Sequence, residues 1–255
     1  MAIIALRAWY LEKYEPISQL EQRPHDLRLS RNSLLKSGLR ADFLEDSEEV
    51  QKSLWFQRYL EGQPVEFYIE GSGGYAIANI DLRSHEIYFA KQDVMSHLEP
   101  TIFLCYQTEF PESSDYLRAE LNAILEKLNP KSRIPITLKE SHRLTDGPTR
   151  LDSSLMRSIR QSLLMIADTT AIAPSPLNPN QIFPSPTVCV EVGYALHCKR
   201  TEQILLVQQE RSDLPGQFPF DVPNHNRLTF ADKAQLHKTL PALVQTHLQR
   251  FSLWS

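Results

Sequence analysis

The second part of the chain alternates short apolar runs with amphipathic stretches, and this alternation constrains the fold more than any other feature. Three continuous apolar runs, at 102–105, 163–167 and 204–207, have the length of strands and are too short for helices. Such runs are typical of a parallel sheet that is covered on both faces. Leucine and isoleucine recur at helical spacing between the runs, which predicts crossover helices. We therefore predict an α/β fold with these runs as central strands and helices on both faces.

The first part of the chain follows a different pattern. The segment 46–60 predicts a helix, whereas 20–44 is polar, rich in arginine and without a clear period. Short runs typical of half-buried strands occur at 2–10, 65–69, 75–80 and 86–89. We predict a small α+β domain at 1–97, of unknown role, and place the α/β domain at 98–255.

Charge and composition exclude several classes of protein. The formal net charge is −4, which argues against a protein that binds nucleic acid by bulk phosphate neutralisation. No apolar run approaches the roughly 20 residues of a membrane-spanning helix, so we expect no membrane partner. The three cysteines show no metal-binding spacing, which predicts reduced thiols, a cytoplasmic location and no metal site.

The residues that follow the apolar runs are the candidates for a ligand site. In an open α/β sheet the ligand lies beyond the carboxyl ends of the strands, where Tyr106 and Asp168 follow two of the predicted strands. The segment 171–186 comes next and contains five prolines. We expect this segment to lie at the surface near the strand ends as a lid, without joining a strand ladder.

Glu191 is the candidate with the most unusual surroundings. It lies near the start of a predicted helix at 188–199, and its neighbours Val188, Cys189, Val190 and Val192 are apolar. A carboxylate in such surroundings costs free energy unless it is paired or used. One hypothesis is that it stabilises or attacks an oxocarbenium-like centre. The other is that it satisfies backbone amides at the start of the helix.

Several blocks in this region resemble those of one known superfamily. They are the residues at 165–170, the helix at 188–195, the stretch "FPFDV" at 218–222 and the arginine and aromatics at 227–230. Together these blocks resemble the TIR-like and nucleoside deoxyribosyltransferase-like superfamily, in which "IADxT" precedes "NPNVxxELGYA" and "PFD". The resemblance covers roughly 100–255 and implies a Rossmann-like or flavodoxin-like sheet.

The resemblance also implies roles for individual residues. The glutamate of "ELGYA" corresponds to Glu191, which implies that Glu191 is catalytic, and the aspartate of "IADxT" corresponds to Asp168, a second catalytic group. The implied substrate-binding residues are Tyr106, Ser185, Thr187 and Asp221.

One block departs from the family pattern. Ser185 and Thr187 stand where the family has the asparagines of "NPNV", and the deoxyribosyltransferases have an aspartate at the position of Ser185. The departure weakens the transferase interpretation and leaves hydrolysis or simple nucleotide binding open. We therefore carry two hypotheses.

The first hypothesis is a hydrolase of nucleotide N-glycosidic bonds, with an NAD-type substrate and no cofactor. The second is a non-catalytic nucleotide-binding sensor or protein-interaction module. Both predict a nucleotide or nucleoside as the small-molecule partner, and both are compatible with a homo-oligomer.

Overall fold

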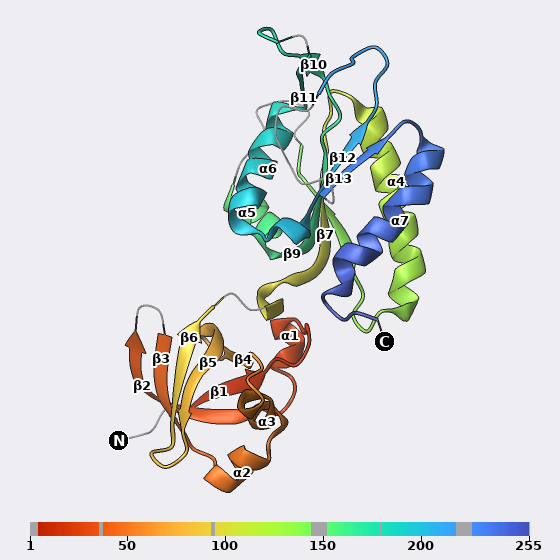
Figure 1. Ribbon diagram of the computed structural model, residues 1–255. Helices are drawn as coiled ribbons and strands as arrows, with labels where there is room; N and C mark the ends of the chain where they lie inside the picture. Colours follow the sequence, from red (N-terminus) through yellow and green to blue (C-terminus); the bar gives the residue numbers. More distant parts are fainter. Residues whose placement is uncertain are drawn as a thin grey trace. The chain divides into compact units, whose positions relative to one another are not determined.

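The structure is a computed structural model that describes residues 5–35, 38–92, 95–143, 152–178, 180–217 and 226–254. The chain divides into two compact units, Met1–His97 and Leu98–Ser255 (Figure 1). No helix in the described ranges is long and apolar enough to cross a membrane.

The first unit is a closed antiparallel barrel of six strands. Its strands follow one another around the barrel as β1 (Ala5–Tyr10), β2 (Leu27–Leu35), β3 (Gly38–Phe43), β6 (Glu86–Lys91), β5 (Gly73–Asp81) and β4 (Glu66–Ile69). Three short helices accompany the strands: α1 (Ile17–Leu20), α2 (Ser47–Lys52) and α3 (Leu54–Leu60). The mixture of strands and helices agrees with the predicted α+β class, and closure of the barrel removes the sheet edges that an open meander would expose.

The polar segment 20–44, for which no strand was predicted, contributes two strands of this barrel. Along β3 the buried side chains of Leu39, Ala41 and Phe43 alternate with Arg40 and Asp42. The buried residues belong to the barrel core, while the arginine is exposed at the outer surface. An alternating strand in a small barrel therefore carries enough polar residues to mask its apolar period.

The second unit contains a five-stranded sheet in which every pair of neighbours is parallel. Its spatial order is β13 (Arg227–Phe230), β12 (Ile204–Gln209), β9 (Ser162–Asp168), β7 (Glu99–Cys105) and β8 (Thr137–Glu140). The three predicted central strands are confirmed as β7, β9 and β12. Numbered in chain order, the strands run 2-1-3-4-5, the doubly wound order whose switch point lies between the first and third strands. That switch point lies between β7 and β9.

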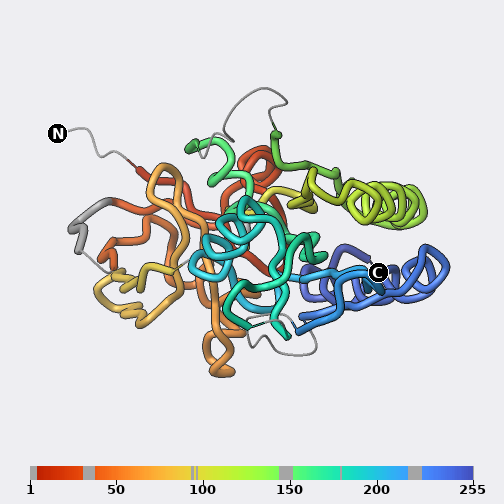
Figure 2. The backbone as a smooth tube through the Cα atoms, turned by 90° about the horizontal axis from the view of Figure 1, so that it is seen from above, coloured from red at the N-terminus to blue at the C-terminus, as the bar shows by residue number. Residues whose placement is uncertain are grey.

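Helices cover both faces of this sheet, as the sequence predicts (Figure 1). One face carries α4 (Pro111–Leu128) and α7 (Lys233–Gln249), which run side by side (Figure 2). The other carries α5 (Ser153–Gln161) and α6 (Pro186–Cys198), which pack on β7 and β9 around Phe103, Met165 and Val188. Pro241 lies inside α7, which continues through this proline as one helix.

The proline-rich segment forms a small hairpin. β10 (Ala173–Pro174) pairs antiparallel with β11 (Ile182–Phe183), so the prediction that this segment joins no ladder is wrong. Pro174 can be accommodated because the hairpin needs only two pairs, and the adjacent amide of Ile172 donates to the carbonyl of Phe183 at 2.8 Å. The side chain of Leu177 is 94% exposed, which agrees with the predicted surface position of this segment.

Candidate functional site

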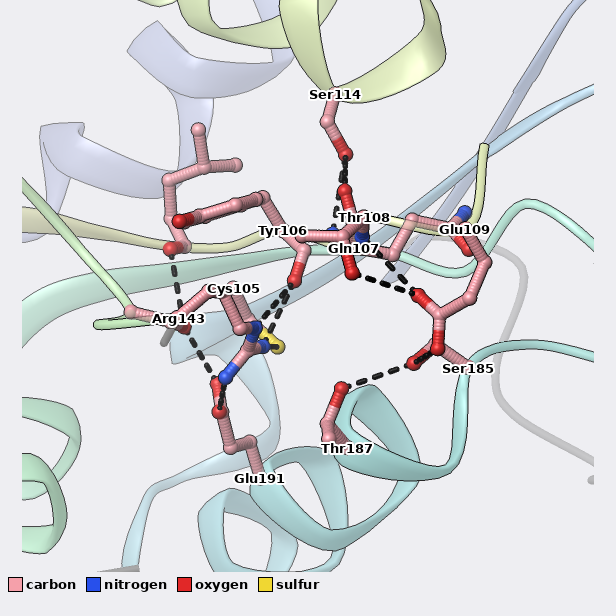
Figure 3. Close-up of polar contacts among 12 residues, drawn as sticks. Cys105, Tyr106, Gln107, Thr108, Glu109, Ser114, Arg143, Ser185, Thr187 and Glu191 are labelled. Carbon is pink, nitrogen blue, oxygen red and sulfur yellow. Dashed lines mark hydrogen bonds and ion pairs between the residues drawn. The ribbon is translucent and has the colours of Figure 1, made fainter. Parts of the chain in front are cut away.

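The candidate site lies at the carboxyl ends of β7, β9 and β12. The four residues that follow β7, Tyr106–Glu109, take part in three hydrogen-bonded groups of residues at this edge (Figure 3). One group runs through Arg143 to Glu191, the second through Ser114 to Asp168, and the third from Glu109 to Ser185. Most of the candidate residues named from the sequence therefore gather around one short loop.

Glu191 is completely buried and lies in the second turn of α6. One carboxylate oxygen accepts from Ser141 Oγ at 2.6 Å, and the other forms an ion pair with Arg143. The carboxylate therefore has a full counter-charge inside the protein. Both interactions are with side chains, so the hypothesis that Glu191 satisfies backbone amides at the helix start finds no support here.

Arg143 was missed at the sequence level, although it is the main partner of Glu191. Its side chain is only 6% exposed, and its Nε and Nη2 donate to the carbonyl of Tyr106 at 3.1 and 2.7 Å. Burial lowers the pKa of Arg143, but the hydrogen bond and charge of Glu191 outweigh this and hold it above its ordinary value. Ser141 and Arg143 follow the end of β8, so they obey the same rule that drew attention to Tyr106 and Asp168 after two other strands.

Cys105 lies next to the same ion pair. It is fully buried, and Arg143 Nη2 lies 3.9 Å from its sulfur. Burial, followed by the nearby charge of Glu191, raises the pKa of the Cys105 thiol well above its ordinary value. The thiol is therefore kept protonated, and Cys105 acts as a small core residue instead of a nucleophile.

The ring of Tyr106 has cationic neighbours. The guanidinium carbons of Arg118 and Arg143 lie 5.0 and 5.3 Å from its centroid, within the range of a cation–π interaction. Arg118 is held in place by Glu140, whose two oxygens accept from its Nε at 2.8 and 3.0 Å. The arginines compete with any base for the face of this ring.

Asp168 is also completely buried and fully hydrogen bonded. Its Oδ2 accepts from Ser113 Oγ at 2.5 Å and from Ser114 Oγ at 2.6 Å, while its Oδ1 accepts from the Thr170 amide at 3.0 Å. Ser113 and Ser114 lie in the first turn of α4, so Asp168 fixes the start of this helix to the end of β9. A negative charge at this place is favoured by the helix dipole.

Ser185 and Thr187 lie together at the start of α6. The Ser185 hydroxyl lies 2.8 Å from Glu109 Oε1 and 2.9 Å from Thr187 Oγ1, and Glu109 Oε2 accepts from the Thr108 amide at 3.0 Å. Burial raises the pKa of Glu109, but the hydrogen bonds from Ser185, its own backbone and Thr108 outweigh it and leave the pKa below its ordinary value. Glu109, which the sequence did not single out, therefore places a charged carboxylate beside the N-terminus of α6.

Two buried glutamines complete this edge. The amide oxygens of Gln107 and Gln209 are buried and accept no hydrogen bond from the described part of the chain. Asp221 lies outside the described residues. Within the described ranges, no group of three histidine, cysteine, aspartate or glutamate side chains could hold a metal ion.

The first unit contains a separate pocket of about 560 Å³ at the end of β1. Three of its carboxylates have arginine partners: Arg23 lies 3.1 Å from Asp26 and 3.3 Å from Glu15, and Arg58 donates to Glu12 at 2.6 Å. The full lining is Tyr10, Glu12, Lys13, Glu15, Arg23, Asp26, Ser53, Leu54 and Trp55. Together with Lys13, the two arginines balance the charge of the three carboxylates, which leaves the pocket with no clear preference for a ligand.

Comparisons with known proteins give no family for this chain. No family model and no curated protein match it. A metal-soaked flavodiiron core from Synechocystis is similar over 60% of this chain and 36% of its own, with a TM-score of 0.37 and 13% identity. A flavodoxin-like domain from Synechococcus is similar over 58% of this chain and 99% of its own, with a TM-score of 0.33 and 13% identity. The chain thus spans about a third of the first of these structures.

Proposed function

We propose that the second unit is a non-catalytic nucleoside-binding module, whose ligand lies at the carboxyl ends of β7 and β9. The observation that carries this proposal is that the carboxylates at this edge already have partners inside the protein. Glu191 is paired with Arg143 and Ser141, and Asp168 accepts three hydrogen bonds. A group that stabilises charge in a reaction must reach the reacting atom, and both carboxylates are 0% exposed.

The ligand at this edge is a neutral nucleoside in preference to a phosphorylated nucleotide. The N-terminus of a helix is a common site for phosphate, because its free amides and dipole favour negative charge. Here Asp168 already accepts hydrogen bonds from the first turn of α4, and Glu109 accepts one from Ser185 at the start of α6. A phosphate at either helix would meet a carboxylate, so charge repulsion favours the uncharged part of a nucleotide.

The second candidate function is hydrolysis of an N-glycosidic bond, with an NAD-type nucleotide as the substrate. One observation favours it: Arg143 joins Glu191 to Tyr106 at the sheet edge where the superfamily resemblance expects the reaction. In this mechanism the bond between C1′ and nitrogen lengthens, the base leaves with the bonding electrons, and water adds to C1′ and releases a proton to the solvent. Glu191 can stabilise the ribosyl cation only after it separates from Arg143. Membership of the TIR-like and deoxyribosyltransferase-like superfamily is part of the same proposal.

One experiment separates the two candidates. The purified full chain is titrated with nucleosides, nucleoside monophosphates and NAD in a calorimeter, and base release is followed by chromatography. We expect binding of nucleosides, weaker binding of the phosphorylated forms and no base release. Base release that falls about a hundredfold or more in Glu191→Gln would support the hydrolase instead. The absence of binding and turnover with the whole panel would overturn both candidates.

A further inference from the structure

Two buried amide oxygens at the candidate site lack a hydrogen-bond donor. Gln107 is 1% exposed and Gln209 is 8% exposed, and in each the Oε1 atom accepts nothing from the residues that the structure describes. Burial of an acceptor without a donor costs free energy, so native proteins usually satisfy such atoms with protein groups, water or a ligand. Two of them at one sheet edge therefore call for a common explanation.

Both glutamines are held around Thr170, which is itself fully buried after the end of β9. The side-chain Nε2 of Gln107 donates to the Thr170 carbonyl at 2.9 Å, and the backbone N–H of Gln209 donates to Thr170 Oγ1 at 2.9 Å. The first bond also fixes the orientation of the Gln107 amide, because the flipped form would set its oxygen against the Thr170 carbonyl. The two glutamines thus follow or end the strands on either side of β9, with Gln107 at the switch point and Gln209 one strand away from it.

The chemistry of this pair selects a hydrogen-bond donor. An amide oxygen only accepts, so its partner must carry an O–H or N–H group. Gln107 is also close to the start of α4, since its own amide donates to Ser114 Oγ at 3.1 Å. The nearby Asp168 already accepts hydrogen bonds from Ser113, Ser114 and Thr170, so it does not depend on a donor from the ligand.

We propose that Gln107 and Gln209 recognise the ribose of the ligand, each amide oxygen accepting a hydrogen bond from one of the vicinal hydroxyls. This inference rests on the proposed nucleoside-binding function and adds the part of the ligand that is recognised. A vicinal diol supplies two O–H donors on adjacent carbons, one for each of the two amide oxygens. Both oxygens are buried, so the ligand reaches them only when a neighbouring segment moves.

The test compares ribose analogues on the unmodified full chain. Adenosine, 2′-deoxyadenosine and 3′-deoxyadenosine are titrated by calorimetry. Inosine probes the contribution of the base. The other ribonucleosides and their 2′-deoxy forms complete the panel. We expect each missing hydroxyl to weaken binding about tenfold, in line with the loss of one buried hydrogen bond. We expect inosine to bind like adenosine. Loss of affinity for inosine alone would assign the glutamines to the base and overturn the inference.

Matched variants then assign the hydroxyls to the glutamines. In Gln107→Met and Gln209→Met, we expect the preference for ribose over deoxyribose to fall about tenfold. The control is Gln203→Met, which removes another buried glutamine whose Nε2 donates to a strand carbonyl, that of Leu163, at 3.1 Å. Gln203 lies at the start of β12, at the opposite edge of the sheet, so its variant should keep the full preference.

The possible failures are distinguishable. If no nucleoside of the panel binds the unmodified chain, the proposed function is overturned and this inference falls with it. If nucleosides bind but deoxy analogues bind equally well, the proposed function stands and the ribose assignment is overturned. An unchanged preference in both glutamine variants would likewise overturn the assignment. If one of the two glutamine variants does not fold, as checked by circular dichroism, the other variant still tests the assignment to the glutamines.

Discussion

At the scale of single residues, the pair of Glu191 and Arg143 gives the sharpest prediction for stability. Their side chains are 0% and 6% exposed, so Glu191→Gln leaves a buried guanidinium without its counter-charge. We expect a loss of about 3–5 kcal/mol in the free energy of unfolding, measured with urea. The control is Glu86→Gln, which removes the partner of the more exposed Arg40 and should cost much less. Equal losses in the two variants would contradict the assigned burial of the pair.

Lys199 predicts a pH dependence of stability. It is 9% exposed, its Nζ donates to the Ser162 carbonyl at 2.6 Å, and burial lowers its pKa from 10.5 to about 8. Between these values the unfolded chain binds the proton more tightly than the folded one, so stability rises with pH through this window. The reference is Lys199→Met, which lacks the titrating group. We expect the unmodified protein to gain stability relative to the variant from pH 8 to 10.5. If the difference in the free energy of unfolding between the two proteins did not change with pH, the lowered pKa of Lys199 would be refuted.

At the scale of elements, two glycines should respond to alanine in opposite directions. Gly193 is exposed within α6, and a Cβ atom there would meet nothing within 4 Å, so Gly193→Ala should stabilise by about 1 kcal/mol. Gly38 begins β3, and a Cβ atom there would lie 2.5 Å from the carbonyl oxygen of Phe89 on β6. Gly38→Ala should therefore destabilise by about 1–3 kcal/mol. Urea unfolding of both variants measures the change in the free energy of unfolding. If both variants were stabilised, or both destabilised, the described surroundings of one of the two glycines would be wrong.

The elements also show what the sequence could and could not predict. Strands buried on both faces, such as β9, appear as unbroken apolar runs and were predicted from that pattern. The alternating strands of the barrel were missed in part, because their outward residues are as polar as those of a loop. The chemistry of Glu191 could be suspected from its apolar neighbours, but its partner Arg143 lies 48 residues away in the sequence. Pairings of this kind depend on which strand ends meet, and periodicity carries no information about that.

At the scale of the whole molecule, the two units should unfold separately, because each has a hydrophobic core built from its own residues. Trp9 and Trp55 are buried in the first unit, while Trp254 is the one tryptophan of the second unit, so fluorescence reports mainly on the first unit. Far-ultraviolet circular dichroism reports mainly on the second unit, which holds the long helices. We expect Gly38→Ala to shift the fluorescence transition alone and Glu191→Gln to shift the dichroism transition alone. If both signals moved together in both variants, the chain would be one cooperative unit, and a ligand at the carboxyl ends of β7 and β9 would stabilise the barrel as well.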